Sequence, residues 1–269
     1  MKKVGMVLNN KKSQIRTFSQ SVAAILRGKN IETWFEHEPW CNTANTDLIL
    51  VLGGDGTVLR AFREFGTLEV PFFCVNFGNI GFLSAIEPDD INEYLPSILE
   101  GKYSIEERTV IQISVIREET EEILCSYALN DVVIRSPQPK ISRQLLKIDG
   151  NIFAKYEGDG IICATPTGST AYSLSAGGAI VDPQMEAIII TPICSRLNMT
   201  KSMVLNAKHK LEIINKDRSP HSLLVIDGVQ HSYLLNDDVI KIEKAALKAK
   251  LVQVKKNRYY HLLHSRLRD

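Results

Sequence analysis

Apolar residues follow two alternating patterns over the first hundred positions of the chain. Short continuous apolar runs without polar alternation predict strands that are buried on both faces. These strand segments are residues 3–8, 31–35, 48–52 and 70–75. Between them, apolar residues recur every three or four positions, which predicts helices at 13–27, 57–65 and 88–99. Strands that alternate with helices favour an α/β domain with a doubly wound, mostly parallel sheet.

From about residue 103 the period changes to the short alternation of half-buried strands. The predicted strands are residues 111–116, 128–134, 145–148, 151–154, 211–214, 223–226 and 239–242. Asp149-Gly150 and Asp227-Gly228 predict tight hairpin turns, and we expect no further role for either pair. This texture predicts an antiparallel, all-β, β-sandwich-like domain.

The change of period divides the chain into three parts. We expect an α/β domain at residues 1–100, a β-rich domain at 101–255 and a tail at 256–269. Tyr259, Leu262, Leu263 and Leu267 predict that the tail is a short helix that packs back on the first domain.

Composition narrows the class of protein without deciding it. The 269 residues are 44% hydrophobic and 23% charged, which is typical of globular proteins. A net charge of +1 gives no basis for nucleic-acid binding, and no apolar stretch has the length of a membrane span. Five scattered cysteines without a CxxC pair indicate reduced thiols. We therefore expect a cytoplasmic protein with no nucleic-acid or membrane partner.

The sequence Gly53-Gly54-Asp55-Gly56-Thr57 directly follows the apolar run at 48–52. Glycines permit a tight turn and close approach of the backbone to a ligand. Open α/β sheets bind their ligands at the carboxyl ends of strands, which is where Asp55 falls. A carboxylate at this place either holds a metal ion or accepts a proton. The alternative is a purely structural turn.

A second polar segment lies at residues 157–178, where another Gly-Asp-Gly surrounds Asp159. Small hydroxyl residues crowd around Gly168, and a helix is expected to start near 169–170, where free N–H groups favour anionic ligand groups. Tyr172 is placed to stack on a flat base. The segment suits a phosphate-bearing ligand such as a nucleotide, and the alternative is a tightly packed helix of small residues. No P-loop and no GxGxxG pattern is present.

Three separated motifs, in this order, resemble the NAD kinase family. Residues 53–57 resemble its first motif, Asn130-Asp131 its second, and Gly158-Asp159-Gly160 with residues 165–178 its third. The loop with Asn76, Gly78 and 81–83 is also similar. The resemblance implies transfer of the terminal phosphoryl group of ATP, or of polyphosphate, to the 2′-hydroxyl of the adenosine ribose of NAD. The product is NADP.

The same resemblance assigns roles to residues of this sequence. Asp55 becomes the general base, and Gly53, Gly54 and Thr57 bind the phosphate donor. The substrate-binding residues that it implies are Gly56, Arg60, Phe82, Asn130, Asp131, Asp159, Thr170, Ala171, Tyr172, Ser173, Leu174 and Ser175. It also implies Mg²⁺ or another divalent cation with the donor, no dedicated metal ligand from the protein, and a homodimer or homotetramer.

The sequence departs from the family pattern at four positions. Asp131 stands where Glu is common, Phe77 where many members have Arg, Glu157 where a basic residue is frequent, and Val229 where many have Gln. Two other functions share parts of the pattern. A lipid kinase shares the Gly-Gly-Asp-Gly turn, and a non-catalytic dinucleotide-binding sensor would keep the hydroxyl-rich segment without needing Asp55.

Overall fold

The computed structural model describes residues 1–38, 41–79, 81–118, 121–138, 140–196, 201–217, 222–254 and 258–268. The chain forms two compact units. The first combines Met1–Glu107 with Ala249–Asp269, and the second is Arg108–Lys248. Within the described residues, no helix has the length and apolar character needed to cross a membrane.

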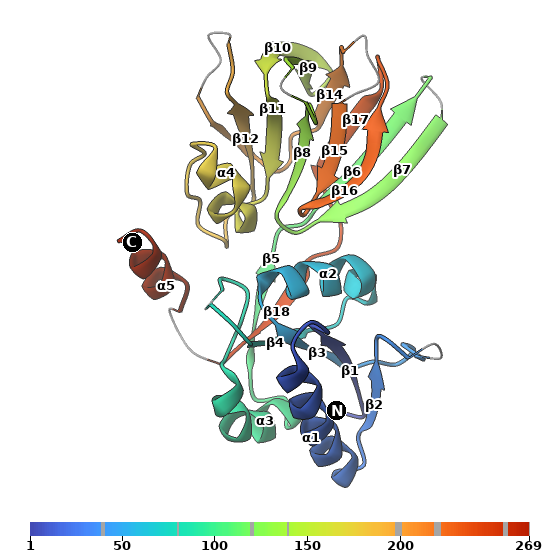
Figure 1. Cartoon of the computed structure of the whole chain (residues 1–269), viewed down its shortest axis with the longest axis vertical. Helices are drawn as coiled ribbons and strands as arrows, with labels where there is room; N and C mark the ends of the chain where they lie inside the picture. Colours follow the sequence, from blue (N-terminus) through green and yellow to red (C-terminus); the bar gives the residue numbers. More distant parts are fainter. Residues whose placement is uncertain are drawn as a thin grey trace. The chain divides into compact units, whose positions relative to one another are not determined.

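The first unit contains one six-stranded sheet in the order β2-β1-β3-β4-β18-β5 (Figure 1). The pairs β1–β2, β1–β3, β3–β4 and β4–β18 are parallel. The elements are β1 (Lys3–Leu8), α1 (Ser13–Gly28), β2 (Glu32–Phe35), β3 (Leu48–Gly53), α2 (Asp55–Phe65), η1 (Gly66–Leu68), β4 (Phe72–Asn76), η2 (Pro88–Asp90), α3 (Ile91–Leu99), β5 (Ser104–Arg108), β18 (Ala249–Gln253) and α5 (Arg258–Arg266).

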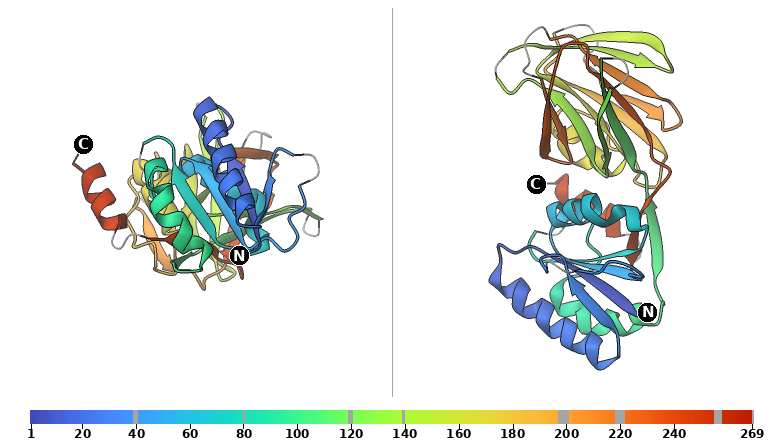
Figure 2. Two further views of the ribbon diagram at one scale, coloured as in Figure 1. Left: turned by 90° about the horizontal axis from the view of Figure 1, so that it is seen from below. Right: turned by 90° about the vertical axis from the view of Figure 1, so that its right-hand side faces the viewer.

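Helices cover both faces of this sheet, with α1 and α3 on one face and α2 on the other (Figure 2, right). Leu26 of α1 and Ile98 of α3 share a buried cluster with Phe73 of β4. Phe72 points to the opposite face, because successive strand residues alternate, and its ring lies 6.0 Å from that of Phe62 in α2. The predicted doubly wound, mostly parallel sheet is confirmed.

The return of the chain to the first unit differs from the sequence expectation. The sequence predicts that residues up to 255 belong to the β-rich domain, but β18 (Ala249–Gln253) lies in the first sheet between β4 and β5. Leu251 pairs with Phe72, and Val252 joins the buried cluster of that unit. A short apolar pattern predicts a strand equally well for either sheet, so the local sequence does not reveal its partner.

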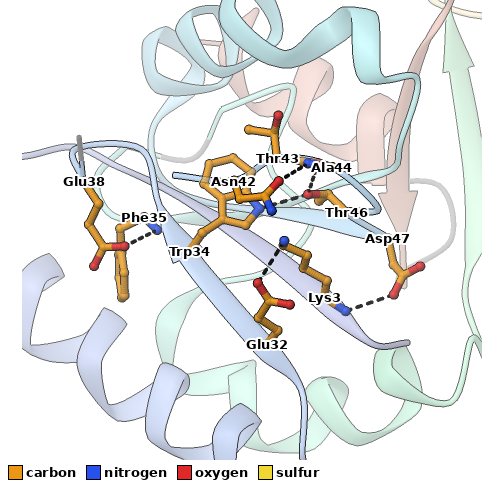
Figure 3. Close-up of polar contacts among 10 residues, drawn as sticks. All are labelled: Lys3, Glu32, Trp34, Phe35, Glu38, Asn42, Thr43, Ala44, Thr46 and Asp47. Carbon is orange, nitrogen blue, oxygen red and sulfur yellow. Dashed lines mark hydrogen bonds and ion pairs between the residues drawn. The ribbon is translucent and has the colours of Figure 1, made fainter. Parts of the chain in front are cut away.

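Polar contacts fix the segment between β2 and β3 at the edge of this sheet (Figure 3). The Trp34 indole N–H donates to the Thr46 hydroxyl at 2.9 Å. The Lys3 N–H donates to the Asp47 carboxylate at 3.0 Å, and the Lys3 ammonium pairs with Glu32 at 2.9 Å. These contacts hold β1, β2 and β3 in register.

The second unit contains two six-stranded antiparallel sheets, in the orders β10-β9-β14-β17-β6-β7 and β13-β12-β11-β8-β15-β16. The strands are β6 (Ile111–Arg117), β7 (Glu121–Ala128), β8 (Asp131–Arg135), β9 (Ser142–Ile148), β10 (Asn151–Gly158), β11 (Gly160–Ala164), β12 (Ala187–Ile193), β13 (Met203–Asn206), β14 (Leu211–Asn215), β15 (Ser222–Ile226), β16 (Val229–Leu234), β17 (Val239–Lys244). The short helices are η3 (Thr167–Thr170) and α4 (Tyr172–Ser175).

The two sheets pack face to face around one buried apolar cluster. Ile113 of β6 and Ile213 of β14 meet Ile134 of β8 and Ile161 of β11 there. The outer face of the β8–β11–β12 region is also covered, because Ile162 belongs to a second cluster with residues of the segment before β12. The prediction of a β-sandwich-like domain is confirmed.

The predicted strand at 128–134 is interrupted. β7 ends at Ala128 and β8 begins at Asp131, so Leu129 and Asn130 form a short break between them. The break contains Asn130, the first residue of the second predicted motif.

Candidate active site

Asp55 begins α2 immediately after β3. Gly53 ends the strand, and Gly54 precedes the helix in an extended conformation without a side-chain cap. Asp55 Oδ2 accepts the Phe82 N–H at 2.9 Å, and Oδ1 accepts the Leu83 N–H at 3.2 Å. The loop after β4 therefore holds the carboxylate at the carboxyl end of β3, where open α/β sheets bind ligands.

Glycine is required at position 81 by this contact. A Cβ on Gly81 would lie 2.0 Å from Asp55 Oδ1, closer than any real contact. Gly53 is equally restricted, because its Cβ would lie 2.2 Å from Thr57 Oγ1. Thr57 is buried and supports the turn from inside, whereas Gly54 is half-buried and Gly56 exposed. The accessible backbone of the predicted donor site is thus at Gly54 and Gly56.

The two glycine-rich turns of the first unit are joined. The Phe77 N–H donates to the Gly53 carbonyl at 3.1 Å, and the Asn76 side-chain amide donates to the Gly78 carbonyl at 2.8 Å. The Lys12 ammonium, from the residue before α1, donates to the Phe77 carbonyl. A positive charge therefore lies beside the position where the family often has Arg. Sequence reasoning missed Lys12 because it lies 65 residues away.

Arg60 is engaged in contacts within the unit. Its guanidinium pairs with Glu36 and donates to the Leu8 carbonyl at 2.8 Å. The hydrogen bond to Glu36 is the main reason that the pKa of Arg60 is raised. Glu36 also accepts the Leu8 N–H at 2.9 Å, so the three residues tie α2 to the ends of β1 and β2. The predicted substrate contact of Arg60 must compete with these bonds.

Phe82 connects the loop at Asp55 to the C-terminal helix. Its N–H holds Asp55, and its ring centroid lies 5.5 Å from that of Tyr259 in α5. The sequence predicts that the tail packs back on the first domain, and this ring contact lies within the first unit.

The backbone of the Asn130-Asp131 motif is held by a carboxylate from the hairpin of β15 and β16. Asp227 accepts the N–H groups of Leu129 at 2.9 Å, Asn130 at 2.8 Å and Asp131 at 3.0 Å. The Asp227 N–H in turn donates to the Asp131 carbonyl at 2.9 Å. The sequence treats Asp227-Gly228 as a plain turn, so this role was missed.

Asp131 is one of the few buried carboxyl groups near the candidate site, with 5% of its surface exposed. Burial, followed by the nearby charge of Asp227, raises the pKa of Asp131 to about 7. The group is therefore protonated over part of the neutral range, and a protonated carboxyl can donate a hydrogen bond as well as accept one.

The second and third motifs meet in the second unit. The Thr165 N–H donates to the Asn130 carbonyl at 2.8 Å, and the Thr165 hydroxyl donates to the Leu129 carbonyl. A Cβ on Gly168 would lie 2.1 Å from the Asn130 carbonyl oxygen, so only glycine permits this close packing. The structure therefore brings Asn130, Asp131 and the hydroxyl-rich segment together.

The residues of that segment divide into buried and accessible ones. The Ser173 hydroxyl is fully buried and lies 2.9 Å from the Thr191 hydroxyl, so its bond is internal. Tyr172 is 38% exposed and Ser175 is exposed as well. The remaining predicted residues are half-buried, namely Thr170, Ala171 and Leu174. Fewer residues of the segment are thus accessible to a ligand than the sequence predicts.

Asp159 is not brought to the same place. It joins β10 to β11, its N–H donates to the Ile193 carbonyl at 2.9 Å and its carbonyl accepts the Ser136 N–H at 3.1 Å. Its side chain is exposed. The whole of β11 separates it from Thr165, which is roughly 20 Å for six residues at a strand rise of about 3.3 Å per residue. Within one chain, Asp159 therefore lies away from Asn130 and Asp131.

No group of three or more His, Cys, Asp or Glu side chains in the described residues is arranged to hold a metal ion. Mg²⁺ that accompanies a nucleotide usually keeps several waters and takes one or two carboxylates together with phosphate oxygens. Asp55, beside the accessible glycine backbone, fits that smaller requirement.

Comparison with known proteins shows the family of the chain. Residues 8–103 match the family model of the ATP-NAD kinase N-terminal domain, and residues 129–254 match that of the ATP-NAD kinase C-terminal domain. Together the two models cover most of the chain and define a two-domain kinase. The chain belongs to the NAD kinase family.

Relatives and solved structures extend the comparison. The NAD kinase of Natranaerobius thermophilus is 35% identical and covers 99% of this chain and 98% of its own length. That of Carboxydothermus hydrogenoformans is 40% identical over 84% of this chain and 81% of its own. The structure of an Archaeoglobus fulgidus NAD kinase in complex with ATP aligns with a TM-score of 0.78 at 27% identity, covering 99% and 98%. Yeast NADH kinase complexed with NADH shares the fold, with a TM-score of 0.91 at 23% identity, covering 99% and 87%.

Proposed function

We propose that this protein transfers the terminal phosphoryl group of ATP to the 2′-hydroxyl of the adenosine ribose of NAD and so produces NADP. The observation that carries the proposal is the Asp55 turn. It offers an oriented carboxylate beside accessible glycine backbone, in a chain whose two domains match the ATP-NAD kinase family.

Asp55 acts as the general base. An alcohol is a weak nucleophile, and a positioned carboxylate that accepts its proton accelerates transfer by roughly 10²–10⁴-fold. The Phe82 and Leu83 N–H groups orient the carboxylate, and Gly81 leaves room for it.

The donor phosphates bind at the backbone of Gly54 and Gly56. Phosphoryl transfer depends mainly on positioning and on neutralising charge, so backbone donors at the start of α2 suit the phosphate groups. Because Asp55 is assigned as the base, Mg²⁺ would be held mainly by phosphate oxygens of the donor and by water. When bound, the ion neutralises phosphate charge.

NAD binds to the joined second and third motifs. Asn130 and Asp131 take the adenosine part, and the accessible residues from Thr170 to Ser175 line the ribose and base. Tyr172 presents an exposed ring for the base.

We further propose that the protein is a cytoplasmic homo-oligomer in which a neighbouring subunit supplies Asp159. Three observations support this. All five cysteines are free, as in reducing compartments. Asp159 is exposed and lies at the far end of β11 from Asn130 in its own chain, while Ile152 and Phe153 expose apolar surface on the edge strand β10. Light scattering after size-exclusion chromatography tests the assembly, and a monomer at micromolar concentration contradicts it.

One assay tests the proposed reaction. The purified protein is incubated with NAD, ATP and Mg²⁺, and NADP is measured with an NADP-specific dehydrogenase. Parallel reactions replace ATP by polyphosphate, and NAD by NADH or by diacylglycerol and a sphingoid base. We expect NADP with NAD and ATP. Phosphorylated lipid without NADP would identify a lipid kinase, and NAD binding without any product would identify a sensor.

A further inference from the structure

The second unit contains two Asp-Gly hairpin turns with nearly the same backbone. Asp149 and Gly150 have φ values of 50° and 80°, and Asp227 and Gly228 have 46° and 75°. Both pairs join neighbouring antiparallel strands, β9 to β10 and β15 to β16. Positive φ at both central residues is the requirement of a type I′ hairpin, which Asp-Gly satisfies. Backbone conformation therefore explains both sequences equally, and only the carboxylates distinguish them.

The Asp149 carboxylate makes surface contacts. It accepts the Lys210 N–H at 3.0 Å and lies 2.7 Å from His209 Nδ1, with 51% of the side chain exposed. These bonds fasten the β9–β10 hairpin to the connection between β13 and β14, and they involve no residue assigned to the nucleotide.

The Asp227 carboxylate is buried and holds three consecutive peptide groups. It accepts the N–H groups of Leu129, Asn130 and Asp131, which lie 96 to 98 residues earlier in the chain. Only 8% of Asp227 is exposed. Three converging N–H groups stabilise the ionised carboxylate.

The carbonyl groups of the same peptide segment are held by the third motif. Thr165 bonds the carbonyls of Leu129 and Asn130, and Gly168 packs against the Asn130 carbonyl. The direction of the Asn130 and Asp131 side chains therefore depends both on Asp227 and on the hydroxyl-rich segment.

We propose that Asp227 is a positioning residue for NAD, since its carboxylate sets the backbone of residues 129–131 and so directs Asn130 and Asp131 toward the dinucleotide. The proposal rests on the proposed NAD kinase function. Asp227 itself touches no substrate in this scheme and acts through the segment that it holds.

The test compares Asp227→Asn with Asp149→Asn, which changes the matching residue of the other hairpin. An asparagine offers one acceptor oxygen, so its NH₂ group would face at least one of the three N–H donors. For Asp227→Asn we expect the KM for NAD to rise roughly 10–100-fold, as for loss of a charged hydrogen bond. The KM for ATP should stay within about twofold, and Asp149→Asn should leave both constants unchanged.

Hydrogen exchange provides a readout that does not need activity. In Asp227→Asn the amides of residues 129–131 should exchange at least tenfold faster, while those of residues 132–135 in the rest of β8 and those of β15 stay protected. An unchanged KM for NAD, or an equal rise in the KM values for NAD and ATP, overturns the proposal. So does unchanged exchange at 129–131.

Failure of the variant to fold and failure of the proposed function can each be distinguished from failure of this proposal. If Asp227→Asn does not fold, Asp227→Glu keeps the charge and shifts its position by one methylene, and a normal KM for NAD in that variant overturns the proposal. If the unmodified protein forms no NADP, the proposed function fails. NAD affinity by calorimetry and the exchange of 129–131 then still decide whether Asp227 positions a dinucleotide site.

Discussion

The two Gly-Asp-Gly turns of this chain have the same central residues and different surroundings. Asp55 leads from β3 into α2, and two backbone N–H groups of the following loop hold its carboxylate. Asp159 leads from β10 into β11, so neighbouring strands bond its peptide group and its side chain is exposed. The turn at Asp55, which opens a helix at the end of a parallel strand, therefore places backbone donors around its aspartate. For Asp159, the neighbouring strands bond the peptide group instead of the carboxylate.

This difference shows that the Gly-Asp-Gly sequence alone does not specify a catalytic group. Asp55 is made a candidate base by Phe82, 27 residues later, and by the missing side chain at Gly81. Asp159 lacks such a neighbourhood, which is why we assign it to substrate binding rather than to proton transfer.

The strongest test of the comparison is Asp55→Asn. We expect kcat to fall roughly 10²–10⁴-fold with little change in NAD affinity, because the amide keeps the size but cannot accept the proton. Steady-state kinetics and calorimetry measure the two effects. Asp47→Asn is the matched control, since Asp47 also accepts two consecutive backbone N–H groups in the same unit. A near-normal kcat in Asp55→Asn would remove the base assignment.

Gly81→Ala tests whether the loop positions Asp55. The new methyl group would overlap Asp55 Oδ1, so the loop or the carboxylate must move. We expect kcat to fall on the order of tenfold to a hundredfold, with a loss of about 1–3 kcal/mol in the free energy of unfolding. Gly28→Ala is the control, because nothing lies within 4 Å of a Cβ there. Equal kinetics in both variants would show that the 81–83 loop is not needed for turnover.

A third aspartate sharpens the comparison because, unlike Asp55 and Asp159, it is buried. The pKa of Asp131 rises to about 7 in the folded protein, mainly through burial. The protonated form is thus favoured by folding, and this contribution is lost as the pH rises through 7. As the pH rises from 5 to 8, the free energy of unfolding of the unmodified protein should therefore fall by about 1–3 kcal/mol relative to that of Asp131→Asn. Urea unfolding at both pH values measures it, and parallel pH dependence of the two proteins would contradict the burial argument.

Asp159→Asn should have the smallest effect. We expect a rise of about threefold in the KM for NAD with unchanged kcat, since one exposed hydrogen-bonding group contributes about 1 kcal/mol or less. Steady-state kinetics measure this effect. A fall in kcat comparable to that of Asp55→Asn would mean that the second turn also takes part in the chemistry.

Much of the fold follows from local pattern. The buried run at 48–52 and the helical spacing that follows it predict the strand, the turn and α2, and alternation predicts most strands of the second unit. The Gly-Gly-Asp-Gly-Thr turn likewise follows from the sequence, because glycines and an acid at a strand end have a local physical meaning.

Contacts between distant residues could not be predicted in this way. The pairing of Arg60 with Glu36, the bond from Lys12 to Phe77 and the hold of Asp227 on 129–131 join segments that only the folded chain brings together. For Ser173, the local pattern predicts more than the structure contains. Its place in a run of hydroxyl residues suggests a ligand contact, but its hydroxyl is buried and bonds to Thr191.

The position of β18 has a consequence for how the protein is made. This strand lies between β4 and β5 in the first sheet, yet the whole second unit is encoded before it. During translation at roughly 5–20 residues per second, the nascent chain must therefore present an incomplete first sheet for on the order of 10 s. The edge of β4 stays open throughout that interval, and the second unit can fold on the ribosome before the first is complete.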